Sequence, residues 1–93
     1  MLVKRDYYIN GQWVTPINGT DHHVIDPSTE EPCATISLGG VEDADAAVAA
    51  AKAALPAWMH TDPAERIALV AKLITAYEAR ASDLAEAMSA EMG

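Results

Sequence analysis

Short apolar runs separated by turn-forming pairs characterise the first 39 residues of the chain. Two β-prone triplets, residues 7–9 and 12–14, flank the pair Asn10-Gly11. Asparagine and glycine both tolerate the positive φ angles of a type I′ turn, so this pattern predicts a tight β-hairpin. Thr15-Pro16 ends the second arm, because proline has no N–H to donate to a neighbouring strand.

A second hairpin is predicted between residues 22 and 38. Another Asn-Gly pair, residues 18–19, marks a chain reversal before it. Residues 22–25 favour a strand and residues 26–29, Asp-Pro-Ser-Thr, a turn. Residues 33–38 alternate Cys, Thr and Ser with Ala, Ile and Leu, the period of a half-buried strand. The two hairpins in series predict one small antiparallel sheet.

From residue 40 onward the apolar positions take helical spacing, and no strand pattern returns. Gly40 is the predicted N-cap of a first helix, and the acidic residues that follow suit the positive end of its dipole. Alanine supplies half of its apolar stripe, which has spacings of three and four: Ala44, Val48, Ala51 and Leu55. Pro56 is predicted to end this helix.

Two more helices are predicted after Pro56. The second starts with Asp62 as N-cap, Pro63 at the first helical position and Glu65 at the third. One of its faces is apolar: Ile67, Val70, Ile74 and Tyr77, widened by Leu69 and Leu73. Ser82 is the predicted cap of a third helix, which ends at Gly93. We therefore predict an α+β fragment, with two β-hairpins in residues 1–39 and three helices in residues 40–93.

Charge and composition exclude several classes of function. The net charge of −8 argues against nucleic acid and anionic membranes as partners, because both require a basic face. No apolar run is long enough to cross a bilayer or to form a secretory signal. The single cysteine cannot form an internal disulfide, which is typical of a reducing, cytoplasmic compartment. Since alanine buries little surface, we expect the isolated chain to self-associate or to be partly unfolded.

No catalytic constellation is evident. The sequence has no phosphate-cradling glycine loop, no zinc-ligand spacing and no nucleophile beside a base. Cys33 lies mid-strand without a local cation or helix N-terminus, so we interpret it as a structural thiol. His22 and His23 point to opposite faces of a strand, which favours solvated side chains over a metal pair. Trp13 and Trp58 are interpreted as packing residues.

Three segments together resemble the aldehyde dehydrogenase superfamily. Residues 8–14, YINGQWV, are similar to the opening hairpin of the family. Residues 24–58, VIDPSTEEPCATISLGGVEDADAAVAAAKAALPAW, keep its order of strand, turn, strand and alanine-rich helix closing on Pro-Ala-Trp. Residues 62–93, DPAERIALVAKLITAYEARASDLAEAMSAEMG, resemble the next two helices, from Pro-x-Glu-Arg to Glu-Met-Gly. The similarity covers nearly the whole chain.

The resemblance implies an α/β subunit with a Rossmann-like coenzyme domain, of which residues 1–93 are the N-terminal portion. Such enzymes oxidise an aldehyde to a carboxylic acid through a cysteine thioester and reduce NAD or NADP. The catalytic and remaining coenzyme-binding motifs of the family match no position here. We therefore predict no catalytic and no cofactor-binding residue, and expect this fragment alone to be inactive and to bind no coenzyme. The resemblance also implies an aldehyde substrate and a homo-oligomer, either a dimer or a tetramer.

One further site is implied by the resemblance. Some members hold a structural K⁺ or Na⁺ near the strand that precedes Asn/Asp-Pro and the acidic residue of the Glu-x-Gly helix end. The matching groups are the carbonyl oxygens of Val24 and Ile25 and the carboxylate of Glu91, which are hard ligands suited to such an ion. The same residues also fit a strand end and a helix-ending glutamate that bind no ion.

Two other interpretations remain beside the enzyme fragment. The first is a free-standing acidic helical module that docks on a partner through its hairpin and alanine-rich faces. The second is a truncated regulatory or oligomer-interface piece of the same enzyme.

Overall fold

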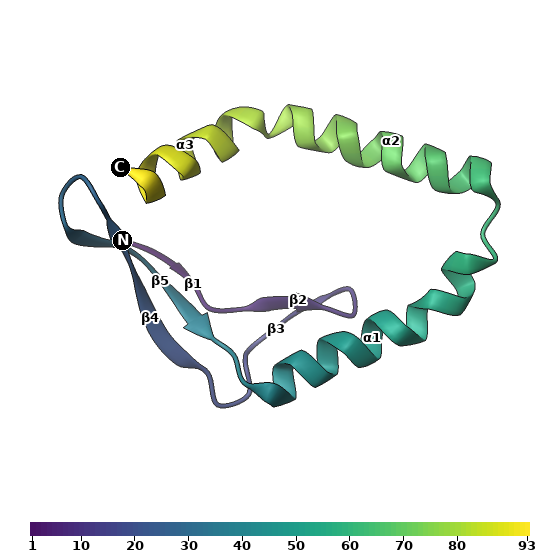
Figure 1. Cartoon of the computed structure of the whole chain (residues 1–93), viewed down its shortest axis with the longest axis horizontal. Helices are drawn as coiled ribbons and strands as arrows, with labels where there is room; N and C mark the ends of the chain where they lie inside the picture. The colour runs from purple at the N-terminus through teal and green to yellow at the C-terminus, as the bar shows by residue number, and fades with distance from the viewer.

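The strands precede the helices, and the chain follows a broad open arc (Figure 1). The computed structural model describes all residues from Met1 to Gly93. The five strands are β1 (Leu2–Lys4), β2 (Tyr7–Ile9), β3 (Gln12–Val14), β4 (Thr20–Asp26) and β5 (Glu31–Leu38). The three helices are α1 (Val41–Met59), α2 (Pro63–Ala79) and α3 (Ala81–Met92). The arc closes where α3 returns to lie against β4.

The first predicted hairpin is confirmed as β2 and β3. Asn10 and Gly11 have φ angles of 54° and 74°, the left-handed conformation that a type I′ turn requires. The strands pair in antiparallel register, with Tyr8 opposite Trp13. Those two rings meet edge to face at a centroid distance of 5.2 Å, so the hairpin is held by a cross-strand aromatic pair as well as by its turn.

The second hairpin is confirmed as β4 and β5, but the prediction of one antiparallel sheet is wrong. β2 and β3 form a sheet of their own, while β4 and β5 belong to a three-stranded sheet in the order β1-β5-β4. In that sheet β1 pairs in parallel with β5, with Leu2 opposite Ala34. A strand of three residues has almost no local signal, and this pairing depends on contacts across more than thirty positions of sequence.

Helix α1 begins as predicted but does not end at Pro56. Gly40 is its N-cap, and the Asp43 carboxylate accepts a hydrogen bond from the Gly40 N–H at 3.1 Å. The helix continues to Met59 with Pro56 inside it. Proline removes one N–H, yet its carbonyl still accepts from the N–H of His60 at 3.3 Å, so one more turn forms.

Helix α2 begins as predicted, whereas α3 does not. Asp62 is the N-cap of α2, and its carboxylate accepts from the Ala64 N–H at 3.0 Å, with Pro63 in the first turn. The prediction that Ser82 caps α3 is wrong, because Arg80 is both the C-cap of α2 and the N-cap of α3. The two helices therefore follow each other almost without a break. Gly93 ends α3 with a φ of 89°, as a helix-ending glycine does.

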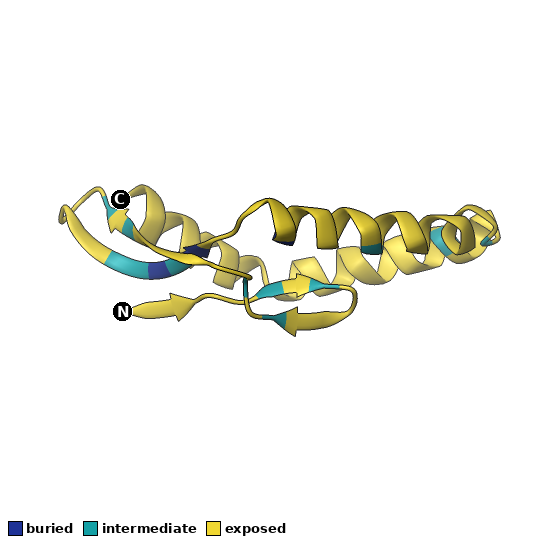
Figure 2. Cartoon of the chain, turned by 90° about the horizontal axis from the view of Figure 1, so that it is seen from below, coloured by how far each residue is buried: buried dark blue, intermediate teal, exposed yellow.

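No hydrophobic side chain is buried anywhere in the chain (Figure 2). Only Thr35, Ser37 and Asp43 are buried, and all three are polar. The accessible surface is 7455 Å², against about 5,200 Å² for a compact protein of this mass. The radius of gyration is 17.0 Å, against about 12 Å for a compact chain of this length. The apolar faces predicted for α1 and α2 exist, but these 93 residues contain nothing that covers them.

None of the three helices combines the length and the apolar character that a bilayer crossing requires.

Candidate functional site

Two side-chain hydrogen-bond groups lie close to the start of α1: Asp43 links this helix to the segment between β3 and β4, and Tyr7 links β2 to β5. Asp43 is 7% exposed, and its carboxylate accepts from the backbone N–H of Ile17 at 2.9 Å as well as from that of Gly40. The hydroxyl of Tyr7 donates to the carbonyl oxygen of Ser37 at 2.7 Å. Both side chains are paired with backbone groups, so their hydrogen bonds join elements of the fold.

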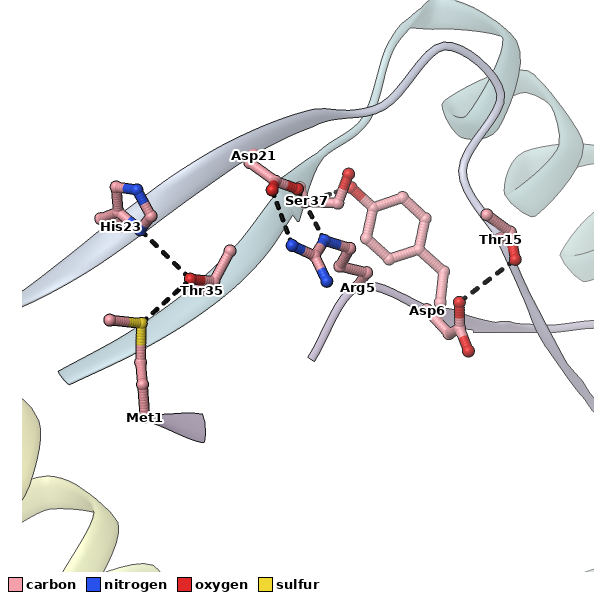
Figure 3. A network of polar contacts seen from close by, with 9 residues as sticks. Met1, Arg5, Asp6, Thr15, Asp21, His23, Thr35 and Ser37 are labelled. Carbon is pink, nitrogen blue, oxygen red and sulfur yellow. Dashed lines mark hydrogen bonds and ion pairs between the residues drawn. The ribbon is translucent and has the colours of Figure 1, made fainter. Parts of the chain in front are cut away.

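An ion pair and a short polar chain lie beside these hydrogen bonds (Figure 3). The guanidinium of Arg5 donates to both carboxylate oxygens of Asp21 at 2.7 Å. These hydrogen bonds, with the attraction between the two charges, lower the pKa of Asp21 and raise that of Arg5, while desolvation acts in the opposite direction on both groups. Because both side chains are exposed, the pair holds the segment after β1 against β4 only weakly.

The hydroxyl of Thr35 lies between two residues. Its Oγ1 is 3.3 Å from the sulfur of Met1 and 3.1 Å from Nδ1 of His23 (Figure 3). This links β4 and β5 to the start of the chain. His22 and His23 both lie on β4 and both are exposed, as predicted. The chain has no group of three or more histidine, cysteine or acidic side chains placed to hold a metal ion.

Cys33 lies on β5 and is half-buried. Its thiol donates to the carbonyl oxygen of Val24 on β4 at 3.4 Å. A thiol bonded to a backbone carbonyl has neither a base to remove its proton nor a cation to stabilise its thiolate. The contact supports the structural interpretation of this cysteine.

The three residues of the implied cation site lie on elements that contact each other. Val24 and Ile25 are on β4, where the pairing with β5 shifts register between them. Glu91 is in the last turn of α3, which lies against β4. The carbonyl oxygen of Val24 accepts from Cys33, and a carbonyl oxygen has a second lone pair for another partner. The ion itself stays a prediction.

A groove that the sequence did not indicate runs between the end of α1 and one face of α2. Trp58 forms one wall, and an apolar stripe with one charged residue forms the other: Pro63, Arg66, Ile67, Val70 and Ile74. Its volume is about 490 Å³. Nε of Arg66 is buried without any hydrogen-bond partner in the chain. One feature of the sequence could have indicated this groove: Arg66 lies on the same face of α2 as its apolar residues, because a helix repeats its faces every three to four positions.

Comparison with known proteins connects these features to one family. Residues 13–93 match the model of the aldehyde dehydrogenase family. The chain is 39% identical over 89 residues to a 3-succinoylsemialdehyde-pyridine dehydrogenase from a Pseudomonas species, which covers 96% of this chain and 19% of that protein. The crystal structure of an aldehyde dehydrogenase from Bartonella henselae superposes with a TM-score of 0.96 at 54% identity. The superposition covers 100% of this chain and 20% of the Bartonella henselae chain.

The chain thus spans about a fifth of the length of the proteins it resembles. Its order of strands and helices is that of the N-terminal segment of these subunits. The family match covers far more than half of its residues. This chain belongs to the aldehyde dehydrogenase family.

Proposed function

We propose that this chain is the N-terminal portion of the coenzyme domain of an enzyme that oxidises an aldehyde to a carboxylic acid and reduces NAD or NADP. The observation that carries the proposal is the match of residues 13–93 to the family, together with 54% identity to a solved aldehyde dehydrogenase. In this proposal the reaction passes through a cysteine thioester, and the reactive cysteine lies outside these 93 residues. Cys33, which donates to Val24 on the neighbouring strand, is not that nucleophile.

The contribution of this segment is structural. No residue here matches the coenzyme-phosphate loop of the family, so no contact with NAD or NADP is assigned to the chain. The Tyr7 hydrogen bond joins β2 to β5, and the Asp43 carboxylate joins the start of α1 to Ile17 in the segment between β3 and β4. Its apolar helix faces are exposed and suited to packing against a larger domain.

A K⁺ or Na⁺ ion bound by the carbonyl oxygens of Val24 and Ile25 and by Glu91 is part of the proposal. The register shift between Val24 and Ile25 supports it, because irregular pairing turns strand carbonyls away from their partners. The contact of α3 with β4 also supports it, since it brings the helix end toward this strand. Three oxygen ligands are fewer than such an ion takes, so the other ligands come from outside the chain.

We also propose a homo-oligomer, a dimer or tetramer, in the cytoplasm. The single half-buried cysteine supports a reducing compartment. Nothing in the comparisons favours the free-standing interaction module, because the relatives match the chain along its length as part of a larger enzyme.

The test is a hybrid polypeptide in which this chain replaces the matching N-terminal fifth of the Bartonella henselae protein. We expect the hybrid to form NAD(P)H from aldehydes, and the 93-residue chain alone to form none with any aldehyde. The matched control is the Bartonella henselae protein with its matching segment deleted, which we expect to be inactive. A soluble, folded hybrid without turnover, or turnover by a pure sample of the 93-residue chain, contradicts the proposal.

A further inference from the structure

We draw no further inference here: the strongest candidate, the exposed edge-to-face pair of Tyr8 and Trp13 on the β2–β3 hairpin, is an unpartnered aromatic face, and nothing in the structure shows what covers it.

Discussion

Replacement of Asp43 by alanine is the perturbation that most directly probes how this segment is joined together. The carboxylate accepts from two backbone N–H groups, that of Ile17 at 2.9 Å and that of Gly40 at 3.1 Å, and it is 7% exposed. Ile17 lies between the two hairpins and Gly40 caps α1, so the Asp43 side chain links the start of α1 to a residue 26 positions before it. Alanine leaves both N–H groups without an acceptor.

The magnitude follows from those two bonds. Each hydrogen bond to a charged acceptor contributes about 1.5–3 kcal/mol, less when water reaches the freed donor. Loss of a carboxylate from the first turn of a helix removes about 0.3–1 kcal/mol more. Two such bonds and the helix contribution add to about 3–7 kcal/mol. Water that reaches the freed N–H groups reduces this loss, so we expect Asp43→Ala to lower the free energy of unfolding by about 2–4 kcal/mol. Asp43→Asn keeps one acceptor oxygen and should cost about half as much.

The assay is urea denaturation of the hybrid polypeptide, together with hydrogen exchange of peptides that contain Ile17 and Gly40. Glu42→Ala is the matched control, because Glu42 is an exposed carboxylate in the same turn without such bonds. We expect this control to cost less than about 1 kcal/mol and to leave both amides protected. If Asp43→Ala destabilises the hybrid no more than Glu42→Ala, or if the two amides exchange at the wild-type rate, the bridging role is wrong.

Three further predictions follow from the hydrogen bonds and the exposed surface. Arg5 lowers the pKa of Asp21 in the folded state. The stabilisation from the pair is therefore complete above the pKa of Asp21 in the unfolded state, and it is lost as pH falls through the lower pKa of the folded state. Arg5→Gln should bring the pKa of Asp21 back toward its usual value in an NMR titration, and an unchanged pKa would refute the assignment. Tyr7→Phe removes the hydrogen bond to Ser37 and should destabilise the hybrid by about 1 kcal/mol, whereas Tyr8→Phe, at an exposed position, should have little effect; equal effects would contradict this. The isolated chain should self-associate or melt without a sharp transition, since it has no buried hydrophobic residue; a monodisperse monomer with a cooperative transition, seen by sedimentation and calorimetry, would show otherwise.

Local features of the fold were predictable because their causes lie within a few residues of each other. The Asn10-Gly11 turn, with both φ angles positive, follows from the conformational freedom of those two residues. The start of α2 follows from the Asp62 carboxylate and from Pro63, each within one helical turn of the groups it affects. The predicted end of α1 failed at Pro56, because the loss of one N–H near a helix end is offset by the bonds of the following turn.

The candidate sites divide in the same way. The alternation of side chains along a strand placed His22 and His23 on opposite faces, and the sequence around Cys33 offered no base. In the structure His23 contacts Thr35 and Cys33 donates to the carbonyl oxygen of Val24. No local pattern identified the unpaired Nε of Arg66, because a missing partner is visible only when the neighbours of the residue are known. The hydrogen bond between Asp43 and Ile17 was not predicted either, because its two partners are distant in sequence.

The sequence by itself determined four of the five strands and the three helices, and through its resemblance it indicated the family. The tertiary structure alone decided that β1 joins β5 in parallel, that the strands split into two sheets, and that α3 returns to β4. The physical reason is range: turns, caps and helical periodicity act over a few residues, while strand pairing and helix docking depend on closing long loops.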